Sequence, residues 1–188
     1  MDIVSDQKVI PTADELVARA TAMIPDLRAR ARECEELKRL PDATVAEYKA
    51  NEFFRVCMPK KYGGYEMGWG VLCRIVMEVA NGCASSAWVL AVFCEHANTV
   101  AGFSDEAQAE IWADGPDVAI SSGGNTGTKE SIANKRTLTK TDGGYLLNGW
   151  ATFSSGCDHA TWLTNLSTMD DGSGMMQILT PITPDQII

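Results

Sequence analysis

The sequence is poor in the residues that build metal centres and nucleic-acid surfaces. It has only two histidines in 188 residues, and no Cys, His and Asp cluster has ligand spacing, so a zinc or iron site has no support. The net charge is −9, and the 16 Lys and Arg residues are scattered rather than gathered into a stripe. These absences argue against a bound metal and against a nucleic-acid partner.

Long apolar runs and paired cysteines are missing too. No uncharged apolar stretch approaches about 18 residues, and residues 1–11 have neither a basic start nor an apolar core, so we expect no membrane span and no signal peptide. The six cysteines form no C-x-x-C pair and stand mostly in apolar surroundings, which argues against a disulfide framework. We therefore expect a cytoplasmic protein.

The first half of the chain has the periodicity of helices. Apolar residues recur every three or four positions between residues 12 and 37, and Thr12 with Glu15 has the spacing of a capping box. Pro25 interrupts this pattern, which predicts a helix that is kinked or restarted there. Further helices are expected over about 41–51, 70–80, 85–101 and 104–112.

The second half has the periodicity of strands. Short apolar or alternating segments occur at 118–122, 136–140, 145–148, 162–167 and 175–180. Gly-rich turns separate the second from the third and the fourth from the fifth, which predicts two hairpins. Helices followed by strands predict an α+β fold, with a helical domain over residues 1–115 and a β-domain over 116–188.

A histidine and a tryptophan lie on the most apolar predicted helix, over 85–101, which we expect to be buried on nearly all sides. Trp88 and His96 are eight residues apart and can share one face. One interpretation is a hydrogen-bonded core imidazole beside a core tryptophan. The other is a neutral base or acceptor that faces a cavity.

A loop rich in serine and glycine follows the first predicted strand. Residues 121–127 (SSGGNTG) would present backbone N–H groups and hydroxyls, which suits a planar polar ligand or a phosphate. The loop lacks a P-loop lysine and the spacing of a dinucleotide fingerprint. A plain connection between strands is the alternative.

The stretch 149–162 (GWATFSSGCDHATW) concentrates aromatic rings, hydroxyls and glycines. A flat ring could rest on Phe153 while the hydroxyl of Ser154 or Ser155 donates to a ring nitrogen, because strand alternation would place Phe153 and Ser155 on one face. The alternative is a strand with a core aromatic followed by a turn. His159 and Asp158 could cap that turn or fix the loop.

Taken together, these segments resemble those of a known family over nearly the whole chain from about residue 12. The family is that of the flavin-dependent monooxygenases built on the acyl-CoA dehydrogenase fold, the oxygenase components of two-component aromatic hydroxylases. The matching pieces are Leu40-Pro41-Asp42, Phe53-Phe54-Arg55, residues 59–64 (PKKYGG), residues 83–89 (CASSAWV) with His96, Phe153-Ser154-Ser155-Gly156, and His159-Ala160 with Trp162.

The resemblance implies a cofactor, a substrate and roles for single residues. Members bind a reduced flavin, FMN or FAD, delivered by a separate flavin reductase, and hydroxylate a phenolic ring with O₂ through a C4a-hydroperoxide. By resemblance, Ser155 or Ser154 is the donor near flavin N5 and Phe153 supports the ring. His96 and Ser122 meet the phenol, beside Trp88, and Ser122 also reaches the flavin. His96 and Ser155 would be the catalytic residues.

Two other functions stay open. One is an acyl-CoA dehydrogenase-like oxidoreductase; against it, such enzymes usually have Trp where Phe153 stands and a Thr-Glu element where this chain has residues 121–127. The other is a non-catalytic subunit that pairs with another chain.

The length sets a further expectation. Members continue into a C-terminal helical bundle, which is absent here, and form homo-oligomers, whereas this chain stops at Ile188 inside an incomplete antiparallel β-barrel-like domain. We therefore expect a truncated product or one part of a split protein, with weak or no activity alone.

Overall fold

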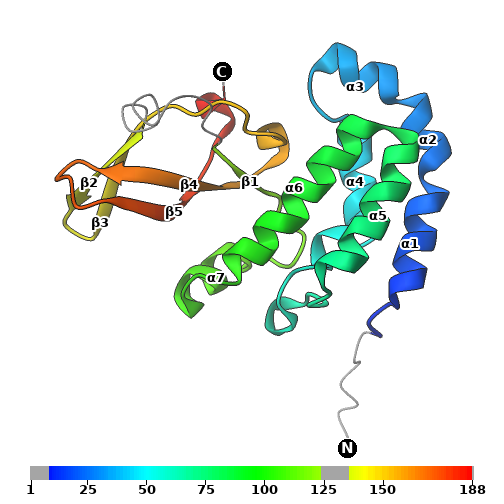
Figure 1. Ribbon diagram of the computed structural model, residues 1–188, viewed down its shortest axis with the longest axis horizontal. Helices are drawn as coiled ribbons and strands as arrows, with labels where there is room; N and C mark the ends of the chain where they lie inside the picture. The colour runs from blue at the N-terminus through cyan, green and yellow to red at the C-terminus, as the bar shows by residue number, and fades with distance from the viewer. Residues whose placement is uncertain (1–8, 124–135, 188) are drawn as a thin grey trace, which may run out of the picture.

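The computed structural model describes residues 9–123 and 136–187, which form a layer of helices beside an open sheet (Figure 1). The α-helices are α1 (Ala13–Ala22), α2 (Ile24–Ala29), α3 (Ala31–Leu37), α4 (Asp42–Ala50), α5 (Trp69–Gly82), α6 (Ala84–Val100) and α7 (Asp105–Ile111). The strands are β1 (Ile120–Ser122), β2 (Arg136–Thr141), β3 (Gly144–Gly149), β4 (Trp162–Met169) and β5 (Met175–Pro181). Short 3₁₀ turns are η1 (Phe53–Arg55), η2 (Lys60–Tyr62), η3 (Cys157–His159) and η4 (Pro184–Gln186). The predicted α+β class is confirmed.

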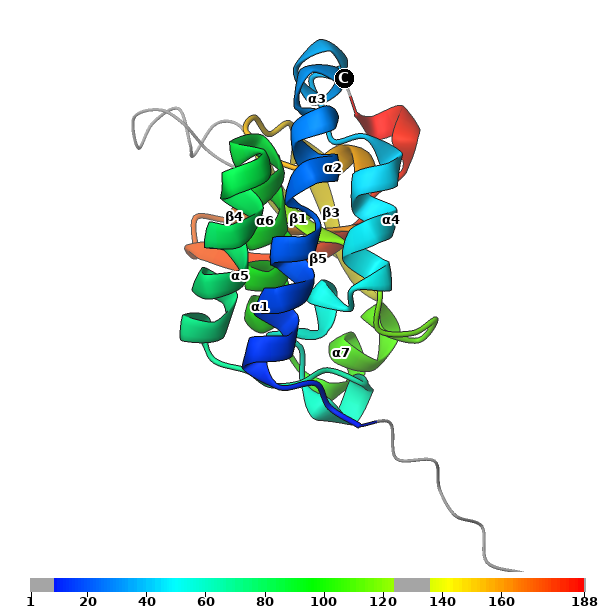
Figure 2. The ribbon, with the colours of Figure 1, turned by 90° about the vertical axis from the view of Figure 1, so that its right-hand side faces the viewer.

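Local chemistry accounts for the starts of the first two helices. Thr12 and Glu15 form a complete capping box at the start of α1. Pro25 lies in the first turn of α2, so the helix is restarted there, as predicted. α3 ends at Lys38, which adopts the left-handed conformation. Three short helices therefore replace one long one. α1 and α2 pack against α5, while α3 lies beyond the end of α2 (Figure 2).

α6 lies between the other helices and the sheet, where it contacts α5 on one side and β1 on another (Figure 1). Its buried residues include Leu90, Phe93 and Cys94. The expectation of burial on nearly all sides is wrong for Trp88, whose side chain is 62% exposed. The reason is that the two packed faces leave a third face of the helix toward solvent.

The sheet has the order β1-β4-β2-β3, and β5 pairs with β4. The two predicted hairpins, β2–β3 and β4–β5, are antiparallel. The pairings of β1 and β2 with β4 are parallel, so the sheet is mixed rather than purely antiparallel. The connection over residues 150–161 leads from the end of β3 to the start of β4. β4 therefore runs in the same direction as β2 and can pair with it in parallel.

Two clusters of apolar side chains hold the molecule together. The larger lies within the helical layer and contains Tyr48, Phe53, Ile75 and Leu90, all fully buried. The smaller joins α6 and α7 to β1. Among the described residues, no helix is long and apolar enough to cross a membrane.

Candidate functional site

The segment that connects β3 to β4 is a turn-rich loop rather than a strand. It has an isolated bridge at Thr152, a turn at Ser155 and Gly156, and then η3. Phe153 adopts a positive φ of 56°, which reverses the chain direction before Ser154. The expected strand alternation of Phe153 and Ser155 is therefore wrong, because the left-handed residue breaks the two-residue period.

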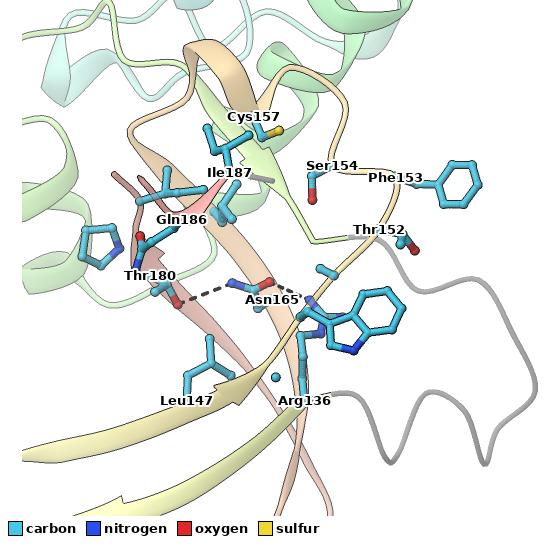
Figure 3. A pocket seen from close by; sticks show the side chains of 16 residues that line it. Arg136, Leu147, Thr152, Phe153, Ser154, Cys157, Asn165, Thr180, Gln186 and Ile187 are labelled. Carbon is cyan, nitrogen blue, oxygen red and sulfur yellow. Dashed lines mark hydrogen bonds between the residues drawn. The ribbon is translucent and has the colours of Figure 1, made fainter. Parts of the chain in front are cut away.

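Phe153 holds its ring in solvent at an energetic cost. Its side chain is 74% exposed, and Figure 3 shows the ring turned away from the neighbouring cavity. A bulky residue in the left-handed region costs about 1–3 kcal/mol, and such strain concentrates at ligand sites. The exposed ring thus has the accessibility that a flat ligand would need, although it is not packed as a wall.

Gly156 seats this loop directly on α6. With φ of 80° it occupies the left-handed region, and a Cβ built there would lie 2.6 Å from the Phe93 ring and 2.7 Å from Val89. Only glycine fits both the conformation and the contact. The backbone beside Ser155 is therefore fixed by the core of the helical layer.

Ser155 is held by two further hydrogen bonds. The buried Ser121 hydroxyl on β1 donates to the Ser155 carbonyl at 2.7 Å. The Trp88 indole N–H donates to the Ser155 hydroxyl at 2.9 Å. Side chains from α6 and β1 thus converge on one half-buried serine.

His159 fixes the far end of the loop to the helical layer. Its Nε2 lies 2.8 Å from the Leu40 carbonyl oxygen and 3.3 Å from Nη1 of Arg39. Asp42 lies 3.8 Å from Nδ1. These contacts fit the predicted loop-fixing role of this histidine and tie the loop to the turn between α3 and α4.

His96 is a buried histidine with one nitrogen engaged. Its Nδ1 lies 2.6 Å from the Val92 carbonyl oxygen, which can only accept, so Nδ1 carries the proton. Glu95 lies 3.1 Å from the same nitrogen. Within the described part of the chain no hydrogen bond engages Nε2.

The serine-rich segment after β1 is only partly described. Ser122 is half-buried and pairs with Thr164 of β4 in the sheet register. Its neighbour Ser121, rather than Ser122, makes the contact with Ser155. The rest of the predicted loop, from Gly124 to Gly127, lies outside the described residues.

A cavity of about 660 Å³ opens between the loop and strands β3, β4 and β5 (Figure 3). Its size falls within the roughly 300–1,000 Å³ of small-molecule sites. Its lining is mostly apolar, with Leu147, Leu163 and Ile187 beside Phe153 and Ser154. A second cavity of about 440 Å³ lies on the other side of the same loop, against α3, and is also lined by Phe153, Ser154 and Ser155.

Arg136 is a residue of the larger cavity that sequence reasoning missed. It is 3% exposed, and its Nη1 donates to the Gly123 carbonyl at 2.9 Å and to Asn165 Oδ1 at 2.6 Å. Burial lowers the pKa of its guanidinium. Its alternation with the buried Leu138 along β2 is the sequence signal that would have placed it inside.

Cys157 lines both cavities, but its thiol is not activated. Burial raises the pKa of Cys157, so the protonated thiol dominates near neutral pH. Its place in the site is therefore that of a small apolar side chain.

The structure brings some of the predicted site residues together and leaves others apart. Ser155 and Trp88 are in direct contact, and Phe153 and Ser154 line both cavities. Neither cavity is lined by Trp88, His96 or Ser122. His96 lies two helical turns from Trp88 along α6.

Comparison with known proteins places the chain in a family. Residues 11–115 match the family described as acyl-CoA dehydrogenase, N-terminal domain. The flavin-dependent monooxygenase oxygenase subunit HsaA of Rhodococcus jostii is 38% identical over 144 residues, which is 77% of this chain and 36% of that protein. The oxygenase component of p-hydroxyphenylacetate 3-hydroxylase from Acinetobacter baumannii is 33% identical over 147 residues, 78% of this chain and 33% of that protein.

A solved structure is similar over most of the chain. XiaF from Streptomyces sp., in complex with FADH2 and glycerol, superposes with a TM-score of 0.80 at 26% identity, over 90% of this chain and 42% of that one. The chain thus spans about a third of the length of the curated relatives that it matches.

Proposed function

Because the chain belongs to the acyl-CoA dehydrogenase family through its N-terminal domain, we propose that it supplies one wall of the active site of a flavin-dependent aromatic hydroxylase. The observation that carries the proposal is the position of Ser155, whose hydroxyl accepts from Trp88 of α6 and whose carbonyl accepts from Ser121 of β1. Ser155 lines the smaller cavity, and its neighbours Phe153 and Ser154 line both. The substrate is a small phenolic compound.

The residues present fit a reduced flavin. The isoalloxazine ring is flat, apolar on its faces and polar along one edge, so it matches an exposed Phe153 beside serine hydroxyls. Phe153 supports the ring, Ser155 or Ser154 donates near N5, and Ser122 reaches the polar edge. When bound, the reduced flavin supplies the electrons that activate O₂; a separate flavin reductase delivers it.

We propose that His96 contacts the phenol group of the substrate. Its Nδ1 proton is committed to the Val92 carbonyl, so Nε2 can accept the proton of a phenol. A phenol with a pKa of about 10 becomes more nucleophilic when a neighbouring imidazole shares its proton. Ser122 and Trp88 flank the substrate in this proposal.

The same proposal includes the organisation of the chain. We propose that residues 1–115 and 116–188 act as two domains, a helical one and part of a β-domain, with the flavin at their junction. In the assembled enzyme the chain works as a homo-oligomer in the cytoplasm.

Flavin binding by the purified chain tests the proposal. Anaerobic titration with reduced FMN and reduced FAD should show saturable binding, and Ser155→Ala should weaken it. Thr139→Ala, on β2 away from the loop, serves as the control and should bind as the parent does. Equal affinity of the parent and the Ser155→Ala variant would remove Ser155 from the flavin site.

Hydroxylation is tested in an assembled enzyme that contains this chain and converts a phenol to its hydroxylated product. His96→Ala should lose most of the hydroxylated product while flavin oxidation continues at a similar rate. Ser155→Ala should release more hydrogen peroxide per flavin oxidised. If hydroxylation is unchanged in the His96→Ala variant, His96 is a structural residue of the core.

A further inference from the structure

The hydrogen bond between Trp88 and Ser155 joins an exposed ring to the residue proposed to contact the flavin. An indole N–H can only donate, so the Ser155 oxygen must accept at 2.9 Å. A serine hydroxyl has a single proton of its own. Within the described residues that proton is donated to no group, so it is left for a ligand.

The rest of the serine cannot move to compensate. Its carbonyl accepts from Ser121, and the following Gly156 rests on Phe93 and Val89. Rotation about the Cα–Cβ bond is then the main freedom of the side chain, and the indole fixes that rotation. Because the indole N–H occupies one side of the Ser155 oxygen, the hydroxyl proton is directed away from Trp88.

We infer that Trp88 is a positioning residue, which locks the Ser155 hydroxyl as a hydrogen-bond donor toward a ligand acceptor atom. The inference rests on the proposed function, in which that acceptor belongs to the flavin ring. It changes the role of Trp88, which acts through Ser155 rather than by ring contact with the substrate. The chemical class recognised at this point is a hydrogen-bond acceptor on a flat heterocycle.

The exposure of Trp88 supports this role over a purely structural one. Its side chain is 62% exposed, so the ring buries little apolar surface on the helical layer. Trp69 on α5 is a matched comparison, because it is 50% exposed and lies outside the site. Replacing either ring by Phe preserves most of the apolar surface and removes only the N–H.

The first arm of the test needs no flavin. Three-bond couplings of the Ser155 β-protons, measured by NMR on the purified chain, report its side-chain rotamer. We expect one rotamer in the parent and in Trp69→Phe, and averaging over rotamers in Trp88→Phe. A single unchanged rotamer in Trp88→Phe would overturn the inference.

The second arm asks whether Trp88 acts through Ser155. Titration with reduced FMN compares Trp88→Phe, Ser155→Ala and the double variant. Each single change should lower the affinity about 3- to 10-fold, and the double variant should lose no more than Ser155→Ala alone. Losses that multiply would show direct contact between Trp88 and the ligand and would overturn the inference.

The two proposals fail in different ways. If the parent chain binds neither reduced FMN nor reduced FAD, the proposed function of this chain fails, and the rotamer measurement alone decides whether Trp88 orients Ser155. If the parent binds flavin but Trp88→Phe binds equally well with an ordered Ser155, only the positioning role fails.

Discussion

The helical layer and the sheet differ in how completely they bury their own apolar surface. Nearly all the large fully buried side chains, such as Tyr48, Phe53 and Ile75, lie in the helical layer. The sheet exposes Leu146 on β3 and Met175 on β5 by about half. The helical layer therefore has a core of its own, while the faces of the sheet are suited to being covered by further structure.

The difference between the two halves shows which part of the molecule holds the loop of the candidate site in place. The loop over residues 150–161 belongs to the sheet in sequence, yet its fixed points, Gly156 and His159, contact α6 and the turn after α3. The half with the larger buried core thus holds the loop in which we propose the site. Variants in the two halves test this contrast, in order of decreasing expected effect.

Loss of a buried ring in the helical layer should give the largest difference in the free energy of unfolding between the two halves. Phe53→Ala empties a fully buried site beside Tyr48 and should lower the free energy of unfolding by about 3–5 kcal/mol. Leu146→Ala on β3 should change it by less than about 0.5 kcal/mol. Urea unfolding followed by far-UV circular dichroism measures both. Similar losses for the two variants would contradict the contrast.

Two glycines with nearly the same φ allow the loop contact to be isolated. Gly156→Ala combines left-handed strain with a clash against Phe93, so we expect a loss of about 2–4 kcal/mol. Gly143→Ala, in the β2–β3 turn with φ of 81° and open space around it, should lose only about 1 kcal/mol. Thermal unfolding compares them, and equal losses would show that Gly156 does not depend on α6.

Alkaline pH should destabilise the helical layer through its buried thiols. Burial raises the pKa of Cys57 to about 11 from an ordinary 9.0. The unfolded chain then releases the proton first, so stability is full below pH 9 and falls as the pH rises toward 11, by about 1–2 kcal/mol at pH 10.5. Urea unfolding of the parent and of Cys57→Ala at pH 8 and 10.5 measures the difference; an equal pH dependence in both would refute this assignment.

The smallest effect is expected at the far end of the loop. His159→Ala removes the contact with the Leu40 carbonyl and should cost about 0.5–1.5 kcal/mol. Asp158→Ala, at the exposed neighbouring position, is the control and should be near neutral. Chemical denaturation gives the stabilities, and limited proteolysis between residues 150 and 161 should be faster only in His159→Ala. If the rate of proteolysis is unchanged in His159→Ala, His159 does not fix the loop.

Local sequence predicted the elements better than their relations. The capping box at Thr12, the restart at Pro25 and both hairpins follow from short-range chemistry, and the structure confirms them. The parallel pairing of β2 with β4 depends on contacts more than 25 residues apart, which no local pattern encodes.

The candidate site shows the same difference between local patterns, which the sequence reveals, and long-range contacts, which it does not. Sequence singled out Ser155 and Trp88 separately, but their contact spans 67 positions and required the fold. Strand alternation failed at Phe153, because its left-handed conformation is disfavoured for phenylalanine and no local pattern predicts it. Arg136 was missed because a charged residue is normally placed outside, although its alternation with Leu138 points inward.

The seat of Gly156 on Phe93 and Val89 has an evolutionary consequence. Phe93 lines neither cavity, so a substitution there changes the shape of the surface on which the loop rests without altering any cavity-lining residue. Diversification of ligand preference in chains of this kind can therefore start in the hydrophobic core of the helices. A comparison of variants that looks only at cavity-lining residues would overlook it.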